Sequence, residues 1–279
     1  TRRIQSPRRG FKTLIGVGKM TSEQLAWKIR RHGIEMTHLS GGSHIGAVMS
    51  VADVIAVLYA EILNFDIENP KSENRDRFIL SKGHAGAAIY AALAESGFFD
   101  TEELKTHYQN GSRLSGHVSH HVPGVDFSTG SLGHGLSAAA GMALAGKLSN
   151  KEYRVYSLLG DGEIQEGQIW EAAMFAGFRK LDNLCVIVDN NNLQIDGAID
   201  EVCSPYPIDK KFESFNFHVI NIDGNDMDAI REAFNEAKAT KGMPTAIIAH
   251  TVKGKGVSFM ENQAGWHGKA PNDEEYAIA

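Results

Sequence analysis

The sequence has few cysteines, no uninterrupted apolar run of membrane-spanning length and no excess of positive charge. Its two cysteines, Cys185 and Cys203, make no disulfide framework, and Cys185 lies in the apolar run LCVIVD, where we expect a buried thiol. No run of about 18 apolar residues predicts a transmembrane helix. The net charge of −6 argues against nonspecific binding to nucleic acid or anionic membranes. We therefore expect a soluble, cytoplasmic protein that binds neither nucleic acid nor membrane.

The chain length bounds the number of domains. With 279 residues, one large α/β domain or two small ones can bury a sizeable core. Residues 1–20 include the basic stretch TRRIQSPRRGFK, which lacks the apolar core of a signal peptide, so we expect a flexible segment there. No repeat, low-complexity tract or linker divides residues 21–279, which we treat as one domain.

Short apolar runs alternate with helical patterns along the chain. The runs are continuous, as is typical of parallel strands covered on both faces, and they lie at 77–81, 154–160, 184–190, 217–223 and 244–252. Helices are expected at about 22–38, 50–63, 84–96, 101–108, 132–148, 166–179 and 226–240. Ser50 with Asp53, and Asp100 or Thr101, have the pattern of helix starts. This order predicts a three-layer α/β/α fold with a mainly parallel sheet.

Polar residues follow two of the predicted strands, at the edge of the sheet where ligands bind in such folds. The strand 154–160 leads into Asp161 between two glycines, and the strand 184–190 leads into Asn191. A carboxylate and an amide oxygen at neighbouring strand ends suit a hard cation such as Mg²⁺ or Ca²⁺, which would also take phosphate oxygens. Either motif alone is typical of an ordinary turn, but together they predict a metal–diphosphate site.

Several ordered motifs resemble one family. The stretch GDGEIQEGQIWEAAMFAGFRKLDNLCVIVDNNN is similar to the GDG…N motif of thiamine diphosphate enzymes. The segments GSHIG, LSKGHA, SGHVSHHVPGVDFSTGSLGHGLS and WHGKAP resemble the histidine-bearing segments of transketolases, in the same order. The resemblance runs from about residue 20 to 275 and covers only the N-terminal, diphosphate-binding half of a full-length transketolase. It implies the thiamine diphosphate-binding fold and transfer of a two-carbon ketol unit from a ketose phosphate to an acceptor.

The resemblance also implies roles for particular residues. The metal ligands would be the side chains of Asp161 and Asn191 and the carbonyl of Leu193. The residues that contact the sugar and assist proton movement would be His44, His117 and His267. The residues around the cofactor would be His84, Gly130, Leu132, Gly160, Gly162, Glu166, Asn191, Ile195 and His267.

Two acidic residues that follow Asp161 receive different interpretations. Glu166 matches a glutamate of the family's subunit interface, where it belongs to a hydrogen-bond network. Glu163 lies near a helix start, where negative charge is favoured, and we expect it to be solvated.

The sequence also departs from the family pattern. Ile45 and Val118 replace the prolines of the family's GHP motifs, and His120 and His121 stand where the family shows other residues. These positions are expected on the substrate side of the site, so they predict an unusual donor or acceptor. The pair His120 and His121 lacks further ligands at zinc-binding spacing nearby.

The resemblance leaves half of the site to another polypeptide. In the family, the glutamate that activates the cofactor lies in a second, pyrimidine-binding domain, as do most of the arginines that bind the sugar phosphate. We therefore expect a partner subunit that carries this domain, in an α2β2 heterotetramer. Two alternatives stay open: a subunit that passes a two-carbon unit to a non-sugar or carrier-protein acceptor in a dedicated biosynthetic pathway, and a non-catalytic cofactor-binding interaction subunit.

Overall fold

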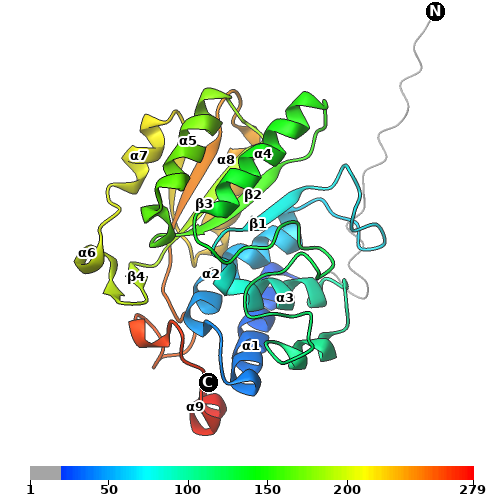
Figure 1. Ribbon diagram of the computed structural model, residues 1–279, viewed down its shortest axis with the longest axis vertical. Helices are drawn as coiled ribbons and strands as arrows, with labels where there is room; N and C mark the ends of the chain where they lie inside the picture. Colours follow the sequence, from blue (N-terminus) through cyan, green and yellow to red (C-terminus); the bar gives the residue numbers. More distant parts are fainter. Residues whose placement is uncertain (1–19) are drawn as a thin grey trace, which may run out of the picture.

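Five parallel strands form the central sheet of the computed structural model, which describes residues 20–279 (Figure 1). Their order is β1-β2-β3-β7-β6, with bounds Arg77–Leu80, Val155–Gly160, Leu184–Asn190, Thr245–His250 and His218–Asp223. All five predicted strands are confirmed, with ends that differ by at most two residues. The predicted flexible segment 1–20 lies outside the described residues apart from Met20.

Helices cover both faces of the sheet, so the predicted three layers are confirmed (Figure 1). Within β3, Cys185 and Ile187 pack into one core and Val186 and Val188 into the other, which explains the continuous hydrophobicity of the strand. The first layer contains α1 (Ser22–Ser40), α2 (Ile45–Val57), α3 (Gly86–Glu95) and α8 (Met227–Ala239). The second layer contains α4 (His134–Leu148), α5 (Gly167–Phe178) and α7 (Ile208–Ser214).

The start of α2 differs from the prediction. The helix begins at Ile45 rather than Ser50 and continues as a π-helical turn, Leu58–Ile62. Ser50 donates a hydrogen bond to Asp189 Oδ2 at 2.8 Å, and Asp53 is paired with Arg30, so both polar residues make long-range contacts instead of capping a helix. By length and composition Ile45–Ile62 could cross a membrane, but 94% of it is buried inside the protein, as expected of a core helix.

Several short elements complete the fold. The predicted helix at 101–108 is a 3₁₀ helix, Thr101–Thr106, and Asp100 caps it by accepting a hydrogen bond from the Glu102 amide. Sequence periodicity did not predict the shortest elements, because each has too few residues to repeat a pattern. They are the antiparallel pair β4 (Leu193–Gln194) and β5 (Gly197–Ala198) and the helices α6 (Ile199–Val202), α7 and α9 (Asp273–Ile278).

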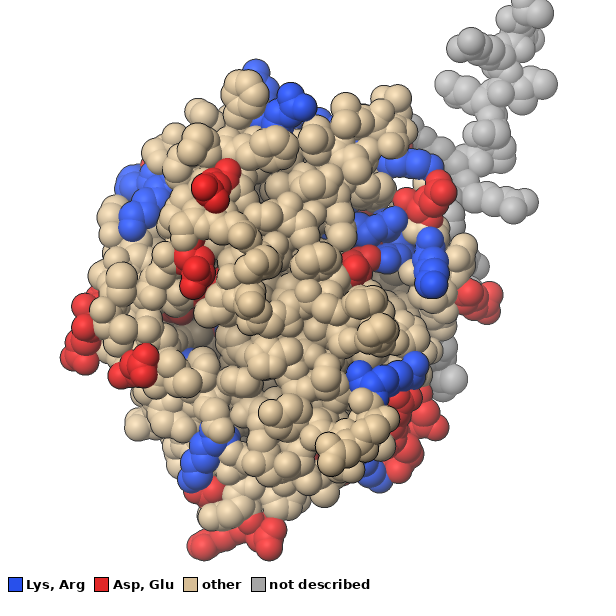
Figure 2. Space-filling model, in the orientation of Figure 1, with Lys and Arg blue, Asp and Glu red and all other residues tan. Residues whose placement is uncertain are grey.

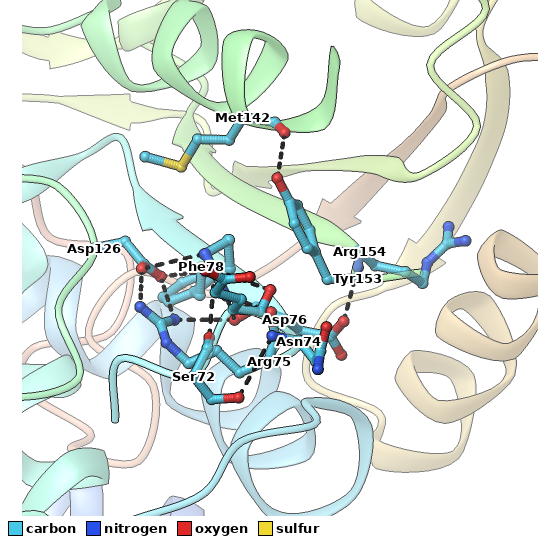
Figure 3. A network of polar contacts seen from close by, with 11 residues as sticks. Ser72, Asn74, Arg75, Asp76, Phe78, Asp126, Met142, Tyr153 and Arg154 are labelled. Carbon is cyan, nitrogen blue, oxygen red and sulfur yellow. Dashed lines mark hydrogen bonds and ion pairs between the residues drawn. The ribbon is translucent and has the colours of Figure 1, made fainter. Parts of the chain in front are cut away.

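A network of hydrogen bonds and ion pairs connects the amino ends of β1 and β2 to neighbouring loops (Figure 3). The Asp126 carboxylate accepts hydrogen bonds from the Arg75 guanidinium and, at 3.0 Å, from the Phe78 amide. Asp76 accepts from the Arg154 amide at 2.7 Å and from the Asn64 amide at 2.9 Å. Because these bonds join residues far apart in sequence, the network holds loops against the sheet at the edge opposite the predicted site.

Candidate functional site

A cleft of about 350 Å³ lies at the carboxyl ends of the strands. Every residue that the sequence pointed to lines it: His44, His84, His117, Gly130, Leu132, Gly160, Asp161, Gly162, Glu166, Asn191, Leu193, Ile195 and His267. Glu166 and Ile195 are exposed at its rim, whereas Asp161 and Asn191 are buried at its floor. The fold therefore brings together residues from seven separate stretches of the chain, although the role of each stays a prediction.

A larger cavity of about 740 Å³ lies between α1, the loop at 255–257 and the C-terminal residues. Its central charges already pair with each other, since Arg30 binds both carboxylate oxygens of Asp53 and Asn225 donates to the same carboxylate. The smaller cleft is the stronger candidate because its polar groups converge on open space.

Four histidines form a cluster on one wall of the cleft. The ring of His44 lies 5.1 Å from that of His84, 5.4 Å from that of His117 and 5.3 Å from that of His267, between ring centroids. Burial lowers the pKa of His44 to about 4 and that of His267 to about 3, and the nearby cations lower both further. Burial also lowers the pKa of His84 and of His117. At neutral pH all four rings are uncharged, so each can donate one hydrogen bond and accept another.

Acceptor oxygens from the ends of β2 and β3 also line the cleft. The Asp161 carboxylate accepts hydrogen bonds from the Gly162 amide at 2.9 Å and the Asn192 amide at 2.6 Å. Burial and the neighbouring Asp189 raise the pKa of Asp161 to about 6, although Lys82 and the two backbone hydrogen bonds act in the opposite direction. Asn191 is oriented through its amide nitrogen, which donates to Asp189 at 3.0 Å.

These oxygens fit a hard divalent cation. A carboxylate, an amide oxygen and the Leu193 carbonyl are the kinds of ligand that Mg²⁺ and Ca²⁺ take. Among residues 20–279 there is no group of three or more His, Cys, Asp or Glu side chains placed to hold a metal. A cation here would therefore complete its coordination with water and with oxygens of a bound diphosphate.

Two buried lysines line the same cleft, and the sequence interpretation missed both. Lys82 forms an ion pair with Asp189, which also accepts hydrogen bonds from Ser50 and Thr251. Lys253 donates to the Leu193 carbonyl at 3.1 Å and lies 2.8 Å from His267 Nδ1. Burial lowers the pKa of Lys253 to about 8, and the nearby Lys82 adds to this.

The position of these lysines in the sequence offered a signal. Lys82 follows β1 by two residues and Lys253 follows β7 by three, so both stand where the sheet delivers its ligand-binding residues. They supply positive charge beside the acceptor oxygens. An anionic group and a cation could thus be held together in one cleft.

Glu163 differs most from its expected position. It was expected to be solvated, but it is 2% exposed and lies at the base of the cleft. Its carboxylate accepts hydrogen bonds from the Ser81 hydroxyl, from the Gly133 amide at 2.9 Å and from the Gly160 amide at 3.0 Å. The tight turn after β2 folds the side chain inward, where three donors compensate the cost of burial. Burial still raises its pKa above the ordinary value.

The residues that depart from the family pattern lie outside the cleft lining. Ile45 and Val118 are buried in the core. His120 and His121 are exposed, with ring centroids 4.3 Å apart, and His120 Nδ1 lies 2.6 Å from Ser128 Oγ. None of the four lines the cleft, so any effect on the substrate would act through neighbouring residues.

Comparisons with known proteins agree with this geometry. Residues 21–279 match the family model for the transketolase, thiamine diphosphate binding domain. The chain is 43% identical over 252 residues to the 6-deoxy-6-sulfo-D-fructose transketolase subunit SqwG of Clostridium sp. (strain MSTE9), which covers 90% of this chain and 92% of that protein. It is 41% identical over 259 residues to an apulose-4-phosphate transketolase subunit of Phocaeicola vulgatus, which covers 93% of this chain and 92% of that protein.

A solved structure extends the comparison to a longer chain. The transketolase from Leishmania mexicana matches with a TM-score of 0.88 and 33% sequence identity. The match covers 94% of this chain but 41% of that one. The chain is thus similar in length to proteins named as subunits and spans less than half of the longer transketolase.

Proposed function

Because the chain belongs to the transketolase family, with the family's thiamine diphosphate-binding domain, we propose that it is one subunit of a two-chain transketolase. In this proposal it works with a separate pyrimidine-domain subunit, in an α2β2 assembly in the cytoplasm. The pair transfers a two-carbon ketol unit from a ketose phosphate to an acceptor. The observation that carries the proposal is the convergence of acceptor oxygens, buried lysines and uncharged histidines in one cleft.

The floor of the cleft would hold the cofactor's diphosphate through a cation. Asp161, Asn191 and the Leu193 carbonyl supply oxygen ligands for Mg²⁺ or Ca²⁺, and Lys253 places an ammonium group beside them. Bringing a cation to Asp161 would lower the pKa of this buried carboxyl and keep it ionised. Bound thiamine diphosphate supplies the nucleophilic carbon and the electron sink for cleavage of a carbon–carbon bond.

The histidine wall would bind the sugar. The rings of His44, His117 and His267 are uncharged at neutral pH, so they can accept protons from hydroxyls and donate hydrogen bonds to carbonyl oxygens. The ammonium of Lys253 next to His267 Nδ1 favours the tautomer that carries its proton on Nε2. The names of the relatives include a sugar phosphate and a sulfo-sugar, which supports a ketose with an anionic end as donor.

The surface supports a partner subunit. Met174, Phe178 and Leu148 are exposed on α4 and α5, with 77% of Phe178 accessible. The segment 114–146, which includes most of α4, has a single charged residue, Asp126. On the face of the molecule that Figure 2 shows, charged side chains lie mainly toward the edges, with few over α4. Large apolar side chains exposed on a face with few charges are typical of a protein interface.

Reconstitution tests the proposal. The chain mixed with a pyrimidine-domain subunit should bind thiamine diphosphate in calorimetry when Mg²⁺ or Ca²⁺ is present and not when both are chelated. The mixture should transfer a two-carbon unit from a ketose phosphate such as xylulose 5-phosphate, whereas the chain alone should not. Turnover by the isolated chain would refute the split assembly, and cation-independent binding would refute the metal site. Binding without any transfer would favour a non-catalytic interaction subunit.

A further inference from the structure

Residues 130–132, between Thr129 and Gly133, form a short segment at the edge of the cleft, which we call the arch. Gly130 and Leu132 line the cleft and are exposed. The arch is anchored before and after. On the upstream side the Thr129 hydroxyl donates to the Leu80 carbonyl at 2.5 Å, and on the downstream side the Gly133 amide donates to Glu163. These two hydrogen bonds connect the residues on either side of the arch to the end of β1 and to the turn after β2.

Glu163, which accepts the hydrogen bond from the Gly133 amide, also connects the arch to other segments that line the cleft. Its three donors come from three segments: Ser81 follows β1, Gly160 ends β2, and Gly133 immediately precedes α4. These segments deliver different parts of the cleft lining, because β1 leads to Lys82 and β2 leads to Asp161. One buried carboxylate thus connects the arch to the segments that carry a cation and a metal-binding oxygen.

The backbone around Gly133 leaves little freedom for another arrangement. Gly133 has φ +87°, and α4 has no side-chain cap at its start. A Cβ atom on Gly135 would lie 2.5 Å from Ser81 Cβ, so α4 begins in close contact with the end of β1. The Gly133 carbonyl accepts from Gln168 at 2.9 Å while its amide donates to Glu163. Both polar groups of this residue are therefore held by the segment that follows Asp161.

We propose that Glu163 is a positioning residue: it fixes the arch 130–132 against the ends of β1 and β2 and so sets the distance between the arch and the diphosphate-binding floor. The inference rests on the proposed function, since the arch matters for catalysis only if the cleft binds thiamine diphosphate. The carboxylate itself faces its three protein donors and acts through Gly133. Its loss should weaken cofactor binding without changing how the sugar binds.

The variant Glu163→Gln tests this proposal. The amide keeps the size of the side chain but replaces one acceptor oxygen with a donor, which would face a backbone amide or the Ser81 hydroxyl. In the full chain, hydrogen exchange of the peptide 129–136 should become faster, while exchange in β2 and β3 should not change. In the reconstituted pair, the Kd for thiamine diphosphate should rise by about tenfold, as for changes to residues that orient a metal or cofactor site without touching the ligand. The KM for the ketose at saturating cofactor should stay within about twofold.

Two further variants make the result interpretable. Ser81→Ala removes one donor and leaves the carboxylate, so it should change the same exchange and the same Kd in the same direction by a smaller factor. It also serves if Glu163→Gln does not fold. Glu232→Gln neutralises an exposed carboxylate on α8, in the layer that does not contain α4 and α5, and should change neither measurement.

The possible outcomes distinguish a failure of the role proposed for Glu163 from a failure of the proposed function. Uniformly faster exchange with an unchanged Kd would show that Glu163 only stabilises the fold and would overturn the proposal. An equal rise in Kd and in the KM for the ketose would also overturn it. If the wild-type pair does not bind thiamine diphosphate, the proposed function fails. The role of Glu163 toward the cofactor fails with it, but faster exchange limited to 129–136 would still establish the attachment.

Discussion

The two ends of the parallel sheet carry buried polar groups that are organised in opposite ways. At the amino end, Asp126 faces the guanidinium of Arg75, and both carboxylate oxygens of Asp76 accept backbone hydrogen bonds (Figure 3). At the carboxyl end, the Asp161 carboxylate is held only by backbone amides, and His44 Nδ1 is buried with no partner among the described residues. At the amino end the carboxylates face protein donors, although burial still raises the pKa of Asp76. At the carboxyl end Asp161 and the histidine rings line a cleft.

This difference predicts that substitutions at the amino end mainly change stability and that substitutions at the carboxyl end mainly change ligand binding. Breaking an internal ion pair leaves a buried charge without compensation, so the amino end should be costly to change. At the carboxyl end Asp189 pairs with Lys82. Burial nevertheless raises the pKa of Asp161 and lowers the pKa of His44 and His267, so these three side chains are buried without full compensation. Changes there should alter ligand affinity much more than folding.

The largest effect is expected for Asp161→Ala. Removal of the only carboxylate proposed as a metal ligand should reduce Mg²⁺-dependent thiamine diphosphate affinity by more than about 100-fold, because even changes next to a metal shell cost 10- to 100-fold. The melting temperature of the chain alone should change little, since the lost hydrogen bonds are offset by removal of a poorly solvated charge. Calorimetry and thermal unfolding measure the two quantities. A large loss of stability with retained affinity would reverse the comparison.

The corresponding change at the amino end is Asp126→Ala. It leaves Arg75 without its carboxylate and the Phe78 amide without its acceptor, and should cost about 3 kcal/mol of unfolding free energy. Affinity for thiamine diphosphate in the assembled pair should be unchanged at temperatures where the variant is folded. Denaturant unfolding measures the loss. A variant as stable as the wild type would show that the network is not a stabilising element.

A smaller effect is expected for Lys253→Met. The substitution preserves most of the side-chain volume and removes the ammonium that contacts the Leu193 carbonyl and His267. The Kd for thiamine diphosphate should rise roughly 10- to 100-fold, as for other lost charge-assisted hydrogen bonds. The melting temperature should not fall, because burial already lowers the pKa of Lys253 to about 8. A fall in stability with unchanged Kd would show that Lys253 stabilises the fold and does not contribute to cofactor binding.

The sequence allowed the fold and the composition of the cleft to be predicted, but not the pairing of its charged groups. Continuous apolar strands and the rule that ligands bind at strand ends were sufficient to bring Asp161 and Asn191 together. The histidines were assigned to the same site by the resemblance to transketolases. The environment of Glu163 was predicted wrongly because its partners, Ser81 and Gly133, are 82 and 30 residues away along the chain. Local helix-start rules gave no information about such distant donors.

The prediction that α2 starts at Ser50 was wrong for the same reason. Ser50 and Asp53 have the spacing of a capping box, but their partners are Asp189 and Arg30. Polar residues followed by an apolar run are read locally as a cap, and only the tertiary structure shows that they are buried.

A fall in pH should also lower the stability of the chain. The unfolded chain titrates its histidines near the ordinary pKa of 6.5, but burial lowers the pKa of His44 to about 4 and that of His267 to about 3. Between these values the unfolded state binds more protons, so the histidines cause stability to fall as the pH drops below 6.5. Asp161 acts with the opposite sign, because its raised pKa of about 6 lets the folded state take up a proton first. Asp161 offsets only part of this loss, because the histidines with a lowered pKa outnumber it, so stability should fall between pH 7.5 and pH 5.

The double variant His44→Asn with His267→Asn isolates the contribution of the histidines. Between pH 7.5 and pH 5 its melting temperature should fall by less than that of the wild type, by about 2–4 °C for each kcal/mol of stability involved. The difference between the two slopes removes the contribution of Asp161, which both proteins share. Equal slopes would mean that the rings take up protons in the folded protein as readily as in the unfolded chain. The carboxyl end of the sheet would then be no less compensated than the amino end.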